Sequence, residues 1–219
     1  MTDVAETQTS LDRQIAKWQT FFDLLGEMDR GQLAKLRHSL SNRPAHFLTG
    51  TIYAAELEHS LKNDWQRAVL ETVAGLFALI ERPHDEQTED EEVRREQRKR
   101  QPLGQLLGEL HIAQNRKSGR KLDASSSIEK RFLALLDSDE YALPYQLRQA
   151  ITLLDASEIK PDWSQLTNDL MFWQSRSGNR IRQDWSDAFY LVAEKEMRRI
   201  ANLDSTNAQA PETPSEDTP

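Results

Sequence analysis

The chain has 219 residues, of which 37% are hydrophobic and 29% are charged, and its net charge at pH 7 is −8. It contains no cysteine, which excludes disulfide bonds, thiolate metal sites and thiol nucleophiles. No apolar run approaches the roughly 20 residues that span a bilayer and no export signal begins the chain, so we expect a cytoplasmic protein without membrane contact.

The negative charge is concentrated in three segments. Residues 1–10 and 202–219 together hold six carboxylates and no basic residue, and residues 85–92 hold six more. The remainder of the chain therefore carries about +4 against the total of −8. An acidic total is thus compatible with a basic face, which binding to phosphate groups requires.

Four helices are predicted in the first half of the chain, because apolar residues recur there every three or four positions. They cover residues 10–25, 29–40, 51–61 and 63–80. Ser10 can cap the first of them, while Pro44 and Pro83 end the second and the fourth. Residues 1–9 have no apolar period, and we expect them to be disordered.

A charged segment at residues 84–101 follows, with an acidic half and then a basic half that contains Arg98, Lys99 and Arg100. Because it has almost no apolar residues, it is either a solvated loop or an exposed helical extension. A polyanion can order such a segment, or the segment can stay in solvent and pair with its own acidic half. Composition favours a segment that stays in solvent and pairs with its own acidic half.

The second half of the chain is predicted to contain five helices, at residues 102–113, 126–136, 144–154, 161–173 and 179–200. Pro102 suits a first helical turn, and Ser126 with Glu129 has the spacing of a capping box. No alternation typical of strands occurs. The sequence therefore predicts an all-α fold of eight or nine helices in one or two bundles, followed by a disordered acidic tail at residues 202–219.

Patterns that carry common catalytic or cofactor chemistry are absent from the sequence. The five histidines are scattered without a pair of metal-ligand spacing, and His84 with Asp85 is a lone dipeptide. There is no glycine-rich phosphate loop, no GxSxG elbow and no calcium-binding loop. We therefore expect no catalytic site, no metal ion and no cofactor.

Basic residues form several groups in the second half of the chain. In chain order these are Arg116, Lys117, Arg120 and Lys121 in the loop at residues 114–127; Lys130 and Arg131 before an apolar helix face; Arg148 in mid-helix; and Arg176, Arg180 and Arg182 between two tryptophan-containing helices. Taken singly, each is most often a solvated charge. If the bundle brings them to one side, they form a cationic track that follows a sugar-phosphate backbone and reads little sequence.

Aromatic residues on the last two helices offer a second possible contact with nucleic acid. Trp163, Trp173, Trp185 and Phe189 could stack on single-stranded bases. Their helical spacing favours packing in the core instead.

Six segments, in this order and spacing, resemble the CasB family, the small subunit of the type I-E CRISPR surveillance complex Cascade. They are DRGQLAKLRH (29–38), PLGQLLGEL (102–110), EKRFLALL (129–136), YQLRQAITLL (145–154), DWSQLTNDLMFW (162–173) and DWSDAFY (184–190). The resemblance covers most of the chain and leaves the two ends outside.

This resemblance implies a two-part helical protein, with an N-terminal bundle at residues 10–101 and a C-terminal bundle at residues 102–201. It implies a subunit without catalytic activity, whose partners are the other Cascade subunits, a second copy packed head to tail, and the backbones of the guide RNA and the target DNA. Base pairing then reads the sequence while the protein braces the duplex and the displaced strand.

Basic positions of the family carry over to Arg37, Lys130, Arg131, Arg148 and Arg176, and in a looser register to Lys62 and Arg67. Two departures are His38, where a second arginine is common, and a longer loop at residues 114–127, which either extends the cationic track or is an idle insertion. The candidate nucleic-acid-binding residues are Arg37, Lys62, Arg67, Arg98, Lys99, Arg100, Arg116, Lys117, Arg120, Lys121, Lys130, Arg131, Arg148, Arg176 and Arg180.

Two functions thus remain open from the sequence. The first is a nucleic-acid-associated structural subunit, which the basic groups favour. The second is an all-α adaptor that contacts only proteins, which the acidic ends and the net charge of −8 favour. An enzyme is the least favoured alternative, because no catalytic constellation is present.

Overall fold

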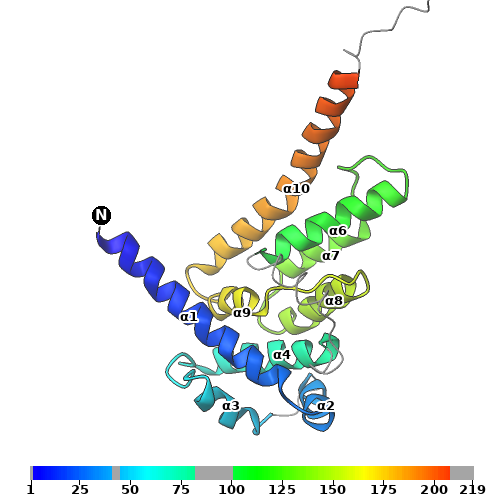
Figure 1. Ribbon diagram of the computed structural model, residues 1–219. Coiled ribbons are helices and arrows are strands. Elements are labelled where there is room, and N and C mark those ends of the chain that lie inside the picture. The colour runs from blue at the N-terminus through cyan, green and yellow to red at the C-terminus, as the bar shows by residue number, and fades with distance from the viewer. Residues whose placement is uncertain (1, 41–44, 82–100, 208–219) are drawn as a thin grey trace, which may run out of the picture.

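The computed structural model describes residues 2–40, 45–81 and 101–207, with side chains between residues 12 and 202 of these ranges. Every regular element in the described ranges is an α-helix, which confirms the predicted all-α fold. The helices are α1 (Thr2–Gly26), α2 (Arg30–Ser39), α3 (Leu48–Ala54), α4 (Asp64–Ile80), α6 (Leu103–Lys117), α7 (Ser127–Leu136), α8 (Leu143–Asp155), α9 (Trp163–Met171) and α10 (Gly178–Asn207) (Figure 1).

Capping side chains fix several of the helix starts that the sequence predicts. The Asp29 side chain accepts the backbone N–H of Gln32 at 2.8 Å, and the Gln32 side chain accepts the N–H of Asp29 in return. The Ser126 hydroxyl accepts the N–H groups of Ile128 and Glu129 at the start of α7. Each cap satisfies donors that the first helical turn leaves without a partner.

Three helix ends lie well beyond the predicted ones. α1 begins at Thr2 and α10 continues to Asn207, so residues 2–9 and 202–207 are helical rather than disordered. α6 continues to Lys117, four residues beyond its predicted end at residue 113. None of these extensions contains a proline or a glycine, and the predictions gave too much weight to the lack of an apolar stripe.

α3 lies at residues 48–54, earlier than the predicted helix at 51–61, because the chain turns at Glu56. That residue has a φ of +54°, in the left-handed region. The N–H of Leu57 donates to the carbonyl of Ile52 at 3.0 Å, the bond that closes a helix with a left-handed residue. Lys17 of α1 donates to the Glu56 carbonyl at 3.0 Å and holds the turn in place.

One apolar core joins the two halves of the chain. Helix α9, from the second half, packs against α1 and α4 of the first half (Figure 1). There the Trp163 ring lies 6.1 Å from Phe22 and 5.7 Å from Phe77, measured between ring centroids. The division into bundles at residues 101 and 102 stays a prediction, and these contacts cross it.

α6 and α10 pack closely against each other, because glycines line their contact. A Cβ atom on Gly108 would lie 2.6 Å from the carbonyl oxygen of Phe189, and one on Gly104 would lie closer still to that of Trp185. Trp163, Trp173, Trp185 and Phe189 are all at most 3% exposed. These aromatic rings therefore pack in the core, and a role for them in stacking on nucleic-acid bases is wrong.

Candidate nucleic-acid interface

α7 presents Lys130 and Arg131 to solvent. Its opposite face buries Ile128, Phe132 and Leu135, and the Phe132 ring stacks on Phe189 of α10 with centroids 4.4 Å apart. This packing fixes the rotation of the helix and leaves both cations exposed. Within the described ranges, neither side chain makes an ion pair or a hydrogen bond with another residue, so their charges are available to a ligand.

α8 packs against α7 and exposes Arg148. Its buried face consists of Leu143, Leu147, Ala150, Ile151 and Leu154. Arg148 lies on the opposite face and has no acidic partner among the described residues. The structure thus places Lys130, Arg131 and Arg148 on two helices in contact, and we call these three residues the α7–α8 cations.

The basic loop after α6 is ordered by a buried polar network that the sequence did not predict. The Asn115 side-chain amide donates to the carbonyls of Leu122 and Ala124, at 3.1 and 2.7 Å. The Nδ1 atom of His111 lies 2.7 Å from the Ser126 hydroxyl. Both His111 and Asn115 are buried. Their spacing of four residues on one helix was the available signal, but the carbonyl partners cannot be read from sequence.

This network determines how the loop presents its charges. Gly119 has a φ of +63° and closes α6, so Arg116 and Lys117 lie in the last helical turn rather than in the loop. Arg120 and Lys121 follow it and are exposed, as Lys117 is. Arg116 instead forms an ion pair with Glu196 of α10. Hydrogen bonds from Arg199, and to a smaller extent from Arg116, lower the pKa of Glu196. Arg116 is therefore the weakest candidate of this group.

The third basic cluster is split between exposed and half-buried positions. Arg176 is exposed in the turn before α10, and Arg180 is exposed but lies 3.9 Å from the carboxylate of Asp184. Arg182 points inward: its Nε donates to the Leu136 carbonyl at 3.0 Å, and its guanidinium lies 4.4 Å from the centroid of the Trp173 ring. Burial lowers the pKa of Arg182. This arginine ties α10 to α7.

Arg37 also has a structural partner. Its Nε donates to the carbonyl of Ala78 in the last turn of α4, and Lys160 donates to the Ile80 carbonyl of the same turn at 2.6 Å. A cation at a helix C-terminus stabilises carbonyls that have no partner within the helix. Arg37 is exposed and holds α4 at the same time.

The remaining candidates lie elsewhere. Lys62 precedes α4 and Arg67 lies on it, and both are exposed. Arg98, Lys99 and Arg100, with the rest of the charged segment before residue 101, fall outside the described residues. That all candidates form one continuous surface stays a prediction.

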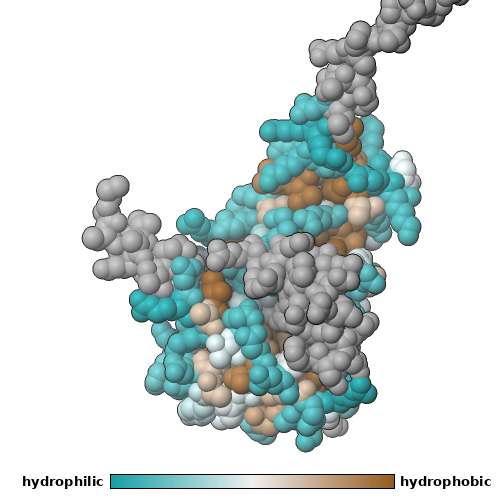
Figure 2. Space-filling view, viewed as in Figure 1, coloured by the Kyte–Doolittle hydropathy of each residue, from teal (hydrophilic) through white to brown (hydrophobic). Residues whose placement is uncertain are grey.

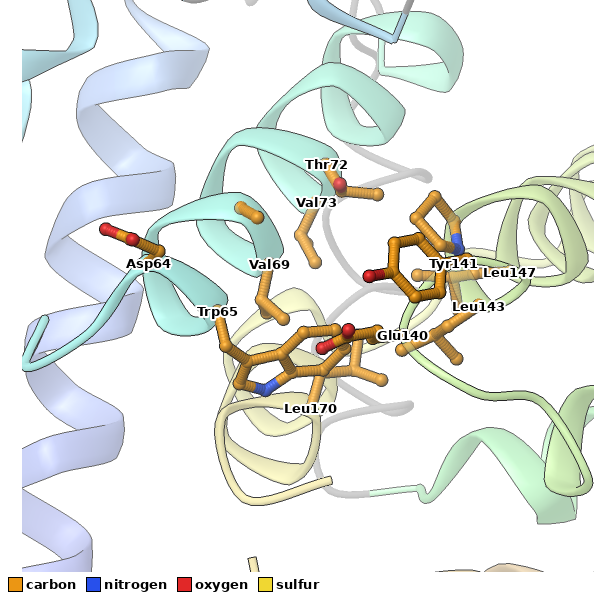
Figure 3. A pocket seen from close by; sticks show the side chains of 12 residues that line it. Asp64, Trp65, Val69, Thr72, Val73, Glu140, Tyr141, Leu143, Leu147 and Leu170 are labelled. Atoms are coloured by element: carbon orange, nitrogen blue, oxygen red, sulfur yellow. The ribbon is translucent and has the colours of Figure 1, made fainter. Parts of the chain in front are cut away.

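An apolar pocket of about 280 Å³ opens between α4, α8 and α9 (Figure 3). Trp65, Val69 and Val73 of α4 line one side, and Leu143 and Leu147 of α8 the other. Its ionisable lining residues are Asp64, Glu140 and Tyr141, and a hydrogen bond with Glu140 raises the pKa of Tyr141. Such a lining suits an apolar group and offers no metal-ligand set.

A groove with apolar residues lies between α6 and α10. Apolar residues gather where α6 and α10 meet (Figure 2), in a groove lined by Ile112, Leu191 and Val192. No three His, Asp or Glu side chains of the described ranges converge as metal ligands would. Among the helices as described, none combines the length and apolar composition that crossing a bilayer requires.

A family model for the CRISPR-associated protein Cse2 matches residues 32–190. The CRISPR-associated protein Cse2 of Thermus thermophilus is 28% identical over 160 residues, which are 72% of this chain and 77% of that protein.

Solved structures agree with this match. The crystal structure of CasB from M. ruber is 31% identical, with a TM-score of 0.65 over 83% of this chain and 97% of its own. A chain of a CRISPR RNA-guided surveillance complex is similar over 87% of this chain and 97% of its own, with a TM-score of 0.57. That chain is 15% identical, so its likeness concerns the fold alone.

Proposed function

This chain belongs to the family of CRISPR-associated Cse2 proteins, and from this we propose that it is the non-catalytic small subunit of a type I-E RNA-guided surveillance complex, Cascade. In that role it braces the duplex of guide RNA and target DNA, and it helps to hold the displaced DNA strand. Its partners are the other subunits, a second copy of itself and the two nucleic-acid backbones. Base pairing supplies the sequence readout.

One observation carries the nucleic-acid part of this proposal: the α7–α8 cations are exposed on helices in contact and lack acidic partners among the described residues. Cations that are not neutralised within the protein can replace the counterions of a phosphate backbone. Packing of α7 on α10 and of α8 on α7 fixes the two helices, so the charges are positioned before a ligand arrives.

A protein–protein adaptor is the second candidate, and a specific observation favours it. Arg37, Arg116 and Arg182 each bind a carbonyl or a carboxylate of this chain. Basic residues that looked like ligand contacts thus contribute to the fold. An adaptor would use the groove between α6 and α10, whose lining combines apolar residues with charged ones such as Glu109 and Lys195, and would leave the α7–α8 cations in solvent.

Charge reversal separates the two functions. Replacing Lys130, Arg131 and Arg148 together by glutamate should leave the fold intact, because all three are exposed. The affinity of the assembled complex for target DNA should fall. The slope of log K against log salt should also become shallower by about 2–3, since each lost phosphate contact removes up to roughly 0.9.

A matched control distinguishes position from net charge. Arg13, Lys35 and Lys195 are exposed on α1, α2 and α10, and reversing them changes the net charge by the same amount. This control should bind target DNA like the unmodified complex. If the α7–α8 variant enters the complex and binds target DNA with unchanged affinity and slope, the adaptor is the correct function.

A further inference from the structure

Two exposed tyrosines precede Arg148 along the chain: Tyr145 lies on α8, and Tyr141 lies in the turn that leads into α8 at Leu143. The Tyr141 side chain is 84% exposed and the Tyr145 side chain 62%, high values for aromatic residues. Tyr141, Tyr145 and Arg148 follow each other at intervals of four and three residues. Residues at these intervals are neighbours on one face of a helix. The α8 tyrosines, as we call Tyr141 and Tyr145, therefore lie in a row that leads to a cation.

The backbone that carries this row is ordered. The Asp139 carboxylate accepts the N–H groups of Tyr141 and Ala142, at 3.0 and 2.8 Å, and the Asp139 carbonyl accepts the N–H of Leu143 at 2.9 Å. These bonds extend helical geometry back to Tyr141, one turn before Tyr145. The inward face is anchored by the buried residues Leu143 and Leu147. The exposed rings thus stand on a fixed support.

Burial in this chain does not account for the two rings. An aromatic side chain gains most of its stabilisation from burial, yet both rings leave most of their surface in water. Tyr141 contributes one edge to the apolar pocket, where Figure 3 shows its ring beside Leu143 and Leu147. In this position the ring remains 84% exposed. Flat π surfaces of this kind are suited to an external planar partner.

The adjacent charge indicates the class of that partner. Single-stranded nucleic acid offers bases with exposed π faces joined by phosphates, and proteins bind it through aromatic stacking beside cations. In a duplex the base faces are already stacked. Asp139 and Glu140 lie at the Tyr141 end and disfavour phosphate there, so the backbone belongs at the Arg148 end.

We propose that the α8 tyrosines stack on bases of a single-stranded nucleic acid whose phosphates lie against Arg148. This inference rests on the proposed function and deepens it: besides holding a backbone electrostatically, the subunit contacts unpaired bases without reading their identity. The displaced strand of a guide–target complex has the required chemistry.

Salt dependence tests this proposal, because stacking and counterion release leave different signatures. The probe is a fluorescent single-stranded oligonucleotide, and its anisotropy is measured with the full chain at several salt concentrations. Replacing the α8 tyrosines by alanine should weaken binding about thirtyfold or more, because each of the two stacked bases contributes roughly 1–3 kcal/mol, and it should leave the salt slope unchanged. Arg148→Gln should instead make that slope shallower by about 0.7.

Matched controls complete the design. Phenylalanine at both positions should retain affinity, because it keeps the ring. Tyr53→Ala changes a tyrosine that is 63% exposed on α3, and it should bind as the unmodified chain does. An abasic oligonucleotide, which has a backbone without bases, should bind the unmodified chain and the alanine variant equally. Circular dichroism verifies that each variant is folded.

Three results would overturn the proposal in distinguishable ways. If the alanine variant binds the oligonucleotide normally while reversal of the α7–α8 cations weakens binding, stacking is wrong and the proposed function stands. If binding of the oligonucleotide does not depend on salt, and neither the alanine variant nor reversal of the α7–α8 cations changes it, the proposed function fails as well. If the alanine variant loses only its incorporation into the complex, the tyrosines contact a protein.

Discussion

Gly108→Ala should destabilise the fold by forcing α6 and α10 apart. The added Cβ would lie 2.6 Å from the carbonyl oxygen of Phe189, whereas contacts between carbon and a carbonyl oxygen usually measure about 3.3 Å or more. The obstacle is backbone, so the helices must separate by about 0.7 Å. A gap of this size forfeits roughly a quarter to a half of the dispersion energy of the atoms concerned.

The net effect combines this loss with a smaller gain. Overpacking of a core costs about 1–3 kcal/mol, and exchange of glycine for alanine in a helix returns about 0.5–1 kcal/mol. We therefore expect a free energy of unfolding about 1–2 kcal/mol lower, and a Tm lower by roughly 2–8 °C. Urea unfolding followed by tryptophan fluorescence measures the free energy of unfolding, because the buried Trp173 and Trp185 lie near the contact between α6 and α10.

Gly50→Ala is the matched control, since nothing lies within 4 Å of its added Cβ in α3. This variant should gain about 0.5–1 kcal/mol from helix propensity alone. The two substitutions therefore have opposite expected signs. A Gly108→Ala chain as stable as Gly50→Ala would refute the idea that glycine is needed for the approach of α6 to α10.

Burial raises the pKa of Asp169 from 3.8 to about 6, despite hydrogen bonds from Trp185 and Gln165 that lower it. Protonated Asp169 therefore stabilises the fold fully below about pH 4, and this stabilisation is lost as the pH rises through 6. The stability of the chain relative to Asp169→Asn should accordingly fall by about 2–3 kcal/mol between pH 4 and pH 7 in urea titrations, and a difference independent of pH would contradict this. Asn115→Ala leaves two loop carbonyls without a donor and should speed amide hydrogen exchange in residues 118–125, while Gln114→Ala, which changes an exposed neighbour, should not. Trp173→Ala should cost about 3–5 kcal/mol of unfolding free energy in the same urea assay, because the ring is fully buried; a small loss would show that the core can close around the gap.

The sequence predicted the fold well where the determinants are local. Asp29 and Ser126 cap helices at the predicted positions, because a capping side chain and the backbone N–H that donates to it lie within three residues. The turn at Glu56 could not be predicted, since a left-handed glutamate depends on the donation from Lys17, 39 residues away. Local pattern carries no information on such a partner.

The candidate site was predictable only in part for the same reason. Lys130 and Arg131 follow from the apolar periodicity of α7, which fixes the exposed face. The Arg116–Glu196 ion pair joins residues 80 positions apart, and Arg37 binds a backbone carbonyl that has no sequence signature. The charge pattern of the sequence therefore identified the groups of basic residues. Tertiary contacts decide which of these residues remain available to a ligand.

The packing of α9 against α1 and α4 limits how the molecule can bend. Rotating one half against the other would pull the Trp163 indole away from Phe22 and Phe77 and would break its 2.9 Å hydrogen bond to Glu81. Such a hinge would expose a large aromatic surface to water, at a cost of several kcal/mol. The two halves should consequently move together as one rigid body, so that any rearrangement of a complex that contains this chain displaces the chain as a whole.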